Sequence, residues 1–426
     1  MEELITNSFD EDKAASVPAF SDSDVLICAA KRTPLGAFLG QQSSLSATDM
    51  GAAVVAACAE QAGFAFTCDL NDSACDDSKR GLIEALYMGC VLPAGLGQAP
   101  ARQTALFAGL PQSVACTTIN KVCGSGMKSA MLACDEIRLG QSQAVIAGGM
   151  ESMSNAPHLL PSVRAGQRFG HGQMLDHLYL DGLEDAYSGR LMGCFADDSA
   201  EQFDISREQM DGFALHSLTE AKRAINDGDF SDEIVPLTVI HRGKESVISQ
   251  DEAPFRANEA KIPTLKPAFG RSGRVTAANA SSMADGAAAL LLMSGAYAKR
   301  LGVKPLAKVL GQASHARAPS EFTQAPVGAI SKLLTQLGWS TTTPDLYEIN
   351  EAFAMVTLLA IQQLDLDPAK VNVHGGACAL GHPLGATGAR ILVTLLHALR
   401  QRGGGRGIAS LCIGGGEATA MAIETL

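Results

Sequence analysis

Residues 124–149 read GSGMKSAMLACDEIRLGQSQAVIAGG, a helical pattern followed by a strand pattern. Its first part, Gly124–Gly140, carries apolar side chains at helical spacing, including Met127 and Cys134. The apolar run Ala144–Ala147 then predicts a buried strand that stops at two glycines. A helix that leads directly into a buried strand is typical of α/β proteins, so we expect helices layered on a sheet.

A second stretch near the end of the chain has the same order. Gly388–Leu399 has helical spacing, Gly407–Cys412 predicts a strand, and glycines follow at 414–416. We interpret the two stretches as one α/β unit used twice, which indicates a duplicated fold. A chance likeness between two ordinary units is the alternative.

The chain between these stretches has a different character. Residues 153–283 contain His- and Gly-rich loops and one amphipathic helical pattern, Arg207–Asn226. Basic side chains are scattered through it, namely Arg164, Arg168, Lys222, Arg223, Lys244, Arg256, Lys261 and Lys266. We expect a separate excursion whose local positive charge suits an anionic ligand.

The composition excludes several classes of function. The formal net charge of -12 argues against general nucleic-acid binding, because phosphate backbones are held by clustered cationic side chains. No apolar run approaches the ~18 residues of a membrane-spanning helix, so we expect no membrane association. Acidic residues dominate the segment before Lys13, which argues against a signal or transit peptide and predicts a cytoplasmic protein.

The 11 cysteines of the chain are scattered singly, mostly within apolar or small-residue runs. Most of them are therefore interpreted as buried, reduced thiols. No CxxC pair and no Cys/His cluster has the spacing of a zinc site, so we expect no metal.

Cys123 is the first candidate for chemistry, because it lies at the entrance of a predicted helix, within Asn120–Met127. Free N–H groups and the helix dipole at such a position favour a thiolate, so we expect the pKa of this cysteine to be lowered. The flanking glycines let a ligand carbonyl approach the backbone closely. A small buried cysteine at a Gly-rich helix entrance is the alternative interpretation.

Three more positions stand out as candidates. His382 lies in the loop Gly375–Gly385, whose glycines and proline fix the path of the chain, and it is placed to act as the base of a thiol. Cys412 ends a predicted strand, at the carboxyl edge where open α/β sheets collect ligands. Asn350 lies among the apolar residues of Tyr347–Phe353, and helix capping is the alternative to a catalytic role.

Together these stretches resemble the thiolase family, from Lys31–Pro34 to the glycines after Cys412. Further agreement comes from Gly148–Ser154, Met192-Gly193, Asn279–Ser281 and Asp285–Ala288. Among thiolases the sequence is most similar to the short-chain acetyl-CoA acetyltransferases. The resemblance implies reversible condensation of two acetyl-CoA molecules into acetoacetyl-CoA and CoA.

The resemblance also implies a fold. It is an α/β fold of five layers, α-β-α-β-α, built from two similar βαβαβαββ halves with an inserted loop domain, usually assembled as a homotetramer. An N-terminal extension would span residues 1–24, the N-terminal half 25–152 and 284–304, the loop domain 153–283, and the C-terminal half 305–426. We expect Val163–Leu180 to lie where subunits associate, and the acidic insertion Cys68–Arg80, unusual for the family, to be exposed.

Residue roles follow from the same resemblance. Cys123 corresponds to the acylated nucleophile, His382 to its activating base, and Cys412 to the acid/base that takes a proton from the second acetyl group. Asn350, acting through a water, and His382 would line one oxyanion site. The backbone N–H groups of Cys123 and Gly414 would form the other.

For the CoA moiety, the resemblance places Ser281 near the pantetheine, Met192 beside the acyl pocket and Arg256 near the nucleotide. CoA thioesters are then substrates, and no cofactor is implied. Leu191 stands where many family members have a histidine before Met-Gly, a departure that bears on acyl specificity.

Other functions share parts of this pattern. A degradative 3-ketoacyl-CoA thiolase for longer acyl chains uses the same catalytic set, and a noncatalytic CoA-binding protein could retain the fold. Decarboxylating condensing enzymes usually employ a Cys-His-His set, whereas Asn350 and Cys412 occupy the places where histidines would be needed.

Overall fold

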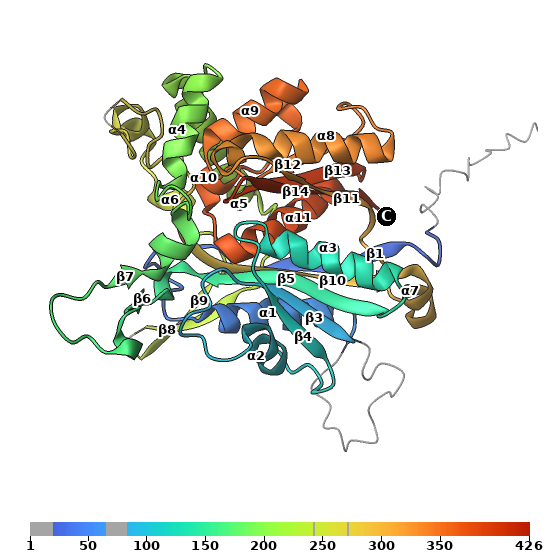
Figure 1. Ribbon diagram of the computed structural model, residues 1–426. Coiled ribbons are helices and arrows are strands. Elements are labelled where there is room, and N and C mark those ends of the chain that lie inside the picture. Colours follow the sequence, from blue (N-terminus) through green and yellow to red (C-terminus); the bar gives the residue numbers. More distant parts are fainter. Residues whose placement is uncertain (1–19, 65–82, 242, 271) are drawn as a thin grey trace, which may run out of the picture.

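The computed structural model describes residues 20–64, 83–241, 243–270 and 272–426. The insertion Cys68–Arg80, predicted to be exposed, lies outside these residues. Within them, a mixed sheet of ten strands forms the frame of the molecule. Its strands fall into two groups, which lie one above the other in Figure 1.

The first group of strands comes from the N-terminal part of the chain. It contains β1 (Val25–Arg32), β3 (Ala85–Gly89), β4 (Ala115–Ile119), β5 (Ala144–Ser152) and β10 (Ala284–Ser294), with the short β2 (Gly36–Ala37) paired to β10. The strands lie in the order β1-β10-β5-β3-β4, which leaves β4 at the edge.

The second group repeats this arrangement. It contains β11 (Ala307–Ala316), β12 (Leu346–Ile349), β13 (Arg406–Ile413) and β14 (Glu417–Thr425), in the order β11-β14-β13-β12. A single parallel bridge between Tyr347 and Val371 takes the place that β4 has in the first group. The two groups join where Leu26 and Ile27 of β1 pair with β11. The expected duplication is thus confirmed.

Helices lie on both outer faces and between the two groups of strands (Figure 1). The outer helices of the first group are α1 (Ala47–Gln61) and α2 (Pro100–Phe107), and those of the second are α8 (Ala325–Leu337) and α9 (Ala354–Leu364). Between the groups pack α3 (Ser125–Arg138) and α11 (Leu384–Gln401). This order of layers confirms the α-β-α-β-α fold that the family resemblance implied.

The regular elements of the excursion between β5 and β10 are chiefly helices, with two short hairpins. It contains α4 (Met192–Gln202), α5 (Arg207–Asp227) and α6 (Ala253–Arg256), and the hairpins β6 (His158–Leu159) with β7 (Leu175–Asp176) and β8 (Leu237–His241) with β9 (Lys244–Ile248). Short helical segments within the excursion are Met153–Asn155, Val163–Ala165, Leu178–Leu183 and Glu259–Thr264. Outside it, the remaining short helices are α7 (Gly295–Leu301), Pro319–Gln324, Pro368–Lys370 and α10 (Ala377–Leu380). The domain limits at 153 and 283 stay a prediction.

Helix α5 shows how local sequence sets an element. Ser206 caps its first turn by accepting the N–H of Gln209, whose side chain bonds back to Ser206, and Gly228 ends it with a left-handed backbone. These signals explain why the observed helix, Arg207–Asp227, agrees with the predicted Arg207–Asn226.

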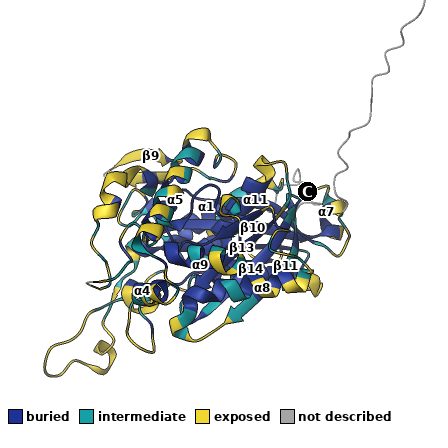
Figure 2. Ribbon diagram, turned by 90° about the horizontal axis from the view of Figure 1, so that it is seen from above, coloured by how far each residue is buried: buried dark blue, intermediate teal, exposed yellow. Residues whose placement is uncertain are grey.

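Burial is concentrated in the middle of the molecule. Figure 2 shows buried residues along β10, β13, β14 and α11, whereas β9 carries exposed ones. Met127 of α3 and Ile391 of α11 belong to the core that fills the space between the two groups of strands. No helix of the described residues is both long and apolar enough to cross a bilayer.

The two middle helices touch at a reciprocal pair of glycines. An added Cβ on Gly126 would lie 2.8 Å from the backbone nitrogen of Ala389, and one on Gly388 would lie 2.3 Å from that of Met127. Glycine inside a helix costs about 1 kcal/mol relative to alanine, so its presence here reflects the close approach of the backbones. The first turns of both helices are thereby brought together.

One expectation about β5 was wrong. Gly148 and Gly149 were expected to end the strand, but β5 continues through them to Ser152. A Cβ on Gly149 would lie only 1.9 Å from the carbonyl oxygen of Gly385, at the start of α11. These glycines therefore allow contact with a neighbouring backbone, and they do not break the strand.

Candidate active site

Cys123 lies in the turn between β4 and α3. The preceding residue, Val122, has a positive φ of 46°, which is unfavourable for a β-branched side chain and marks a strained turn of the kind found at functional sites. The Cys123 side chain is partly buried and packs against a small apolar cluster that includes Leu92 and Leu384. The turn thus directs the thiol inward at the beginning of the middle helix layer.

The pKa of Cys123 corrects an expectation. Burial raises the pKa of this thiol to about 11, although the N–H groups of Gly414 and of Cys123 itself act in the opposite direction. Desolvation disfavours the thiolate more strongly than these donors at the helix entrance favour it. The lowered pKa predicted from the position of Cys123 was therefore wrong.

His382 is buried, and its protonation pattern can be assigned from its neighbours. The hydroxyl of Thr387 donates to the carbonyl oxygen of Pro383 at 2.9 Å, so it accepts from Nδ1 of His382 at 2.6 Å. The other ring nitrogen, Nε2, has no hydrogen-bond partner among the described residues. Burial, helped by the charge of Arg390, lowers the pKa of His382 to about 3. The ring is neutral, with its lone pair on Nε2.

Cys412 lies near the carboxyl end of β13, and Asn350 directly follows the neighbouring parallel strand β12. Burial, and then the proximity of Cys123, raise the pKa of Cys412 well above its ordinary value. Both side-chain atoms of Asn350 that could form hydrogen bonds are buried without a partner among the described residues. Phe353 occupies the N-cap of α9, and no side chain caps that helix, so the capping alternative for Asn350 is excluded.

Gly414 links these groups to the excursion. Its N–H donates toward Sγ of Cys123, and an added Cβ would lie 3.5 Å from Sδ of Met192. The loop after β13 therefore lies between the nucleophile candidate and the first residue of α4. Cys123, Cys412, Gly414 and Met192, which the sequence analysis selected separately, come together here.

A cavity of ≈ 730 Å³ opens between the excursion and the catalytic loops. Met192, Ser281 and Arg256, the three residues predicted to bind CoA, all line it. The cavity wall adjoins His382, the base candidate. Ser282 lines the cavity, and its carbonyl oxygen accepts the backbone N–H of His382 at 2.9 Å. Its walls are mainly apolar, as is usual for pockets that bind an extended ligand.

The predicted basic surface is only partly available. Lys222 pairs with Glu259 at 2.7 Å, and Arg223 pairs with three acidic residues of its own region, Glu220, Asp227 and Asp229. Arg256 pairs with Glu252 at 3.3 Å, but its side chain is 58% exposed at the cavity. Ion pairs thus neutralise part of the charge that the sequence suggested for an anionic ligand.

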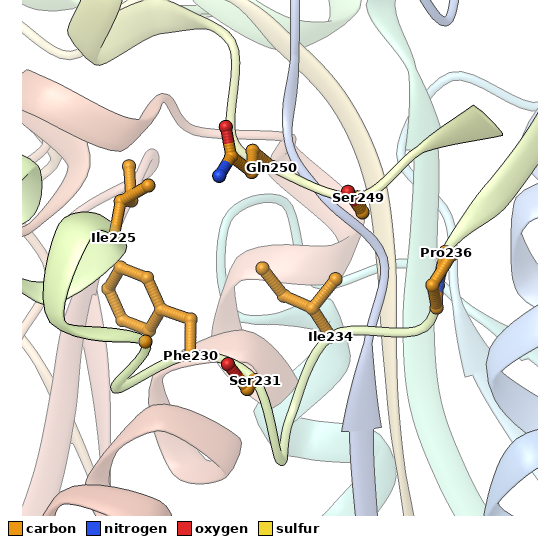
Figure 3. A pocket seen from close by; sticks show the side chains of 8 residues that line it. Ile225, Phe230, Ser231, Ile234, Pro236, Ser249 and Gln250 are labelled. Carbon is orange, nitrogen blue, oxygen red and sulfur yellow. The ribbon is translucent and has the colours of Figure 1, made fainter. Parts of the chain in front are cut away.

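A smaller cavity of ≈ 270 Å³ lies elsewhere in the excursion (Figure 3). Ile225, Phe230, Ile234 and Gln250 are among the residues that line it, and none of the predicted site residues does. Among the described residues, no group of three or more His, Cys, Asp or Glu side chains is arranged to hold a metal ion.

The sequence analysis missed two buried carboxylates beside the site. Glu351 accepts hydrogen bonds from Ser217, Asn372 and the N–H of Cys378, and Glu151 accepts them from backbone N–H groups only, apart from a longer contact with a thiol. Glu151 is the one acidic residue in the apolar and small-residue stretch Ala144–Met153, whereas Glu351 follows Glu348 by three residues. A single acidic residue in an apolar stretch is the sequence signal that would have identified Glu151, because a buried carboxylate needs dedicated hydrogen-bond partners.

The fold and site define a class of protein, and comparison with known families agrees with it. Residues 25–296 match the family described as "Thiolase, N-terminal domain", and residues 303–425 match "Thiolase, C-terminal domain". The chain therefore belongs to the thiolase family, whose members are acyltransferases.

Individual relatives cover nearly the whole chain. Acetyl-CoA acetyltransferase 1 of Arabidopsis thaliana is 48% identical over 404 residues, which are 94% of each chain. The mitochondrial acetyl-CoA acetyltransferase of Bos taurus is 46% identical and aligns over 95% of this chain and 92% of its own. The crystal structure of Acat5 thiolase from Ascaris suum in complex with coenzyme A has a TM-score of 0.87 at 42% identity, covering 95% of this chain and all of that one.

Proposed function

We propose that the protein is an acetyl-CoA C-acetyltransferase, which reversibly joins two acetyl-CoA molecules into acetoacetyl-CoA and CoA. The observation that carries the proposal is the meeting of two thiols: the N–H of Gly414, two residues after Cys412, donates toward the Cys123 thiol. Burial, and then the proximity of Cys123, raise the pKa of Cys412. One thiol serves as nucleophile and the other as acid and base. The names of the relatives support the same activity.

In the first step Sγ of Cys123 bonds to the acetyl carbon of acetyl-CoA, and the bond from that carbon to the CoA sulfur breaks. The Cys123 proton passes to Nε2 of His382, which has its lone pair free. The departing CoA sulfur takes the proton of Cys412. The N–H groups of Cys123 and Gly414 are placed to stabilise the oxyanion on the acetyl group.

In the second step the Cys412 thiolate removes a methyl proton from a second acetyl-CoA. The resulting carbanion bonds to the acetyl carbon on Cys123, the bond from that carbon to Sγ breaks, and Sγ recovers its proton from the imidazolium of His382. The unpaired amide of Asn350, acting through a water, and Nε2 of His382 supply donors for the enolate oxygen. Every group then returns to its starting state.

The ≈ 730 Å³ cavity is the proposed site for the CoA moiety, with Met192 toward the acyl end, Ser281 along the pantetheine and Arg256 at the exposed nucleotide end. CoA thioesters are thus substrates, and the chemistry needs no further cofactor. Initial rates with acetoacetyl-CoA and with a longer 3-ketoacyl-CoA test the chain length. A preference for the longer substrate would favour a degradative thiolase.

The two half-reactions provide the decisive test. Cys412→Ser keeps the shape of the side chain, but its hydroxyl has a much higher pKa than a thiol, so it should scarcely remove the methyl proton. The first half-reaction should survive, because a CoA thiolate can leave without a proton donor and take its proton from water. We therefore expect acetyl-enzyme to accumulate in intact-mass spectra while acetoacetyl-CoA formation falls by about 10²- to 10⁴-fold. Cys123→Ala is the blank. Near-normal condensation by Cys412→Ser would refute the role of Cys412.

We also infer that the protein is a homotetramer. Two surfaces support this. β4 pairs with β3 on one side only within the part of the chain that the structure describes, so its outer edge is open to continue the sheet into a second subunit. The excursion exposes large apolar side chains, including Phe169 and Met174, within the segment where the family resemblance places subunit association.

A further inference from the structure

Glu151, at the carboxyl end of β5, is fully buried and carries out no step of the proposed reaction. Oε2 accepts the N–H of Val91 at 3.0 Å and that of Gly385 at 2.8 Å, and Oε1 accepts the N–H of Leu92 at 3.1 Å. The thiol of Cys90 lies 3.6 Å from Oε1. No lysine or arginine of the described residues forms an ion pair with Glu151. Its carboxylate is therefore held by backbone donors from two separate segments.

These two segments form the wall against which the nucleophile packs. Val91, Leu92 and Leu384 belong to the apolar cluster that contacts the side chain of Cys123. Gly385, the third donor, follows His382 by three residues and is the second residue of helix α11. One side chain thus joins the loop beside Cys123 to the turn that carries its base.

The contact leaves no room for adjustment. An added Cβ on Gly385 would lie 2.9 Å from both Oε2 of Glu151 and Cα of Cys90. Only glycine allows the turn after His382 to come this close to Glu151 and Cys90. The carboxylate of Glu151 therefore sets where this turn lies relative to β5 and to the loop at 90–92.

Electrostatics adds a second link between Glu151 and the nucleophile. Among the described residues, Cys90 and Cys123 are titratable groups on which the charge of Glu151 acts. Burial raises the pKa of Glu151 to about 7, against the effect of its three N–H donors, so the group is ionised in alkaline solution. Its negative charge is one of the causes that raise the pKa of Cys123. A neutral side chain at this position should therefore ease the ionisation of Cys123.

We propose that Glu151 is a positioning residue for the condensation: its carboxylate holds the loop at Val91–Leu92 and the turn after His382 in one arrangement around Cys123. This inference rests on the proposed function. The alternative is a residue that only stabilises the fold, and the two differ in what substitution does to kcat, to KM and to the reactivity of Cys123.

Two variants separate position from charge. Glu151→Gln keeps the length of the side chain, but its NH₂ group must face a backbone N–H in either orientation. Glu151→Asp keeps the charge but is too short to reach all of the donors. Glu136→Gln is the control, because Glu136 is also hydrogen-bonded, to Tyr87 and Ser142, near the far end of α3. Each variant is assayed for acetoacetyl-CoA thiolysis and for alkylation of Cys123 by iodoacetamide between about pH 7 and pH 10, read by peptide mapping.

We expect both Glu151 variants to lower kcat by roughly tenfold or more, with little change in KM for CoA, because Glu151 does not line the ≈ 730 Å³ cavity. Alkylation of Cys123 should shift to lower pH in Glu151→Gln and stay at the wild-type pH in Glu151→Asp. Glu136→Gln should match the wild type in both measurements.

Wild-type kcat and an unshifted alkylation profile in Glu151→Gln would overturn the proposal, as would a loss of kcat that Glu136→Gln shares. Should Glu151→Gln not fold, Glu151→Asp decides alone, because wild-type kcat in that variant is incompatible with a positioning role. A wild-type protein that does not cleave acetoacetyl-CoA would refute the proposed function instead. The alkylation profiles would still show whether Glu151 acts on Cys123.

Discussion

The hydrogen bond between His382 and Thr387 decides which ring nitrogen can accept a proton. Thr387→Val leaves Nδ1–H buried without an acceptor, at a cost of about 1–3 kcal/mol, which the ring avoids by moving its proton to Nε2 or by turning. With either change, Nε2 of His382 can no longer accept the proton of Cys123. We expect kcat to fall about tenfold or more, with KM for CoA nearly unchanged.

Steady-state kinetics of acetoacetyl-CoA thiolysis measures this effect. Thr394→Val is the matched control, because Thr394 is a buried threonine of the same helix that bonds Glu233, away from His382. Equal losses in the two variants would mean that only the packing of α11 had been disturbed.

At this scale the sequence predicted which residues meet but not their ionisation. The glycines around Cys123 and His382 identified both positions, and the cavity lining includes all three residues proposed to bind CoA. The pKa of Cys123 was predicted in the wrong direction, because helix position is visible in the sequence whereas desolvation depends on segments far away in the chain, such as Leu384.

At the scale of elements, Gly149 controls how closely α11 approaches β5. Gly149→Ala would place its Cβ 1.9 Å from the carbonyl oxygen of Gly385, so the start of the helix must move. We expect a loss of about 1–3 kcal/mol or more in the free energy of unfolding, together with lower activity.

Urea unfolding measures the change in stability. The control is Gly212→Ala, at an exposed site inside α5 where an added Cβ meets nothing within 4 Å. It should stabilise the protein by up to about 1 kcal/mol. A stability of Gly149→Ala equal to that of the wild type would contradict the tight contact described for β5 and α11.

The sequence predicted these elements well where local signals are strong. The capped helix α5 was located to within one residue. The end of β5 was not, because glycine is read as a strand breaker when its reason for being there, contact with the backbone of α11, is invisible in the sequence.

For the whole molecule, the excursion and the edge strand predict separate interfaces. Phe169 is 103% exposed and Met174 is 66% exposed, so the double substitution Phe169→Ser, Met174→Ser should remove apolar contact area without harming the folded subunit. We expect light scattering to show a tetramer for the wild type and a dimer, held through β4, for the variant.

Val247→Ser is the control, since Val247 is exposed to a similar extent, 65%, on the hairpin β8–β9. It should leave the tetramer intact. A wild type that is monomeric at micromolar concentration would refute the tetramer, and a double variant that stays tetrameric would place the second interface elsewhere.

The duplicated architecture was predictable from two helix–strand–glycine stretches and the family resemblance. Two of its details were not. Among the described residues, the two groups of strands pair only through Leu26 and Ile27 of β1, and the third strand that the βαβαβαββ order implies for the second half is reduced to the bridge between Tyr347 and Val371. Both depend on pairing between distant segments, which leaves little trace in local sequence patterns.

The crossing of α3 and α11 at Gly126 and Gly388 has a consequence for folding. Cys123 precedes a helix of the first half and His382 a helix of the second, so Cys123 packs beside the segment after His382, at Leu384, only when the halves have docked. Each half can acquire its own helices earlier, as domains of large proteins commonly do. During refolding, recovery of enzymatic turnover should therefore lag behind recovery of helical content, and its rate would time the final docking of the two halves.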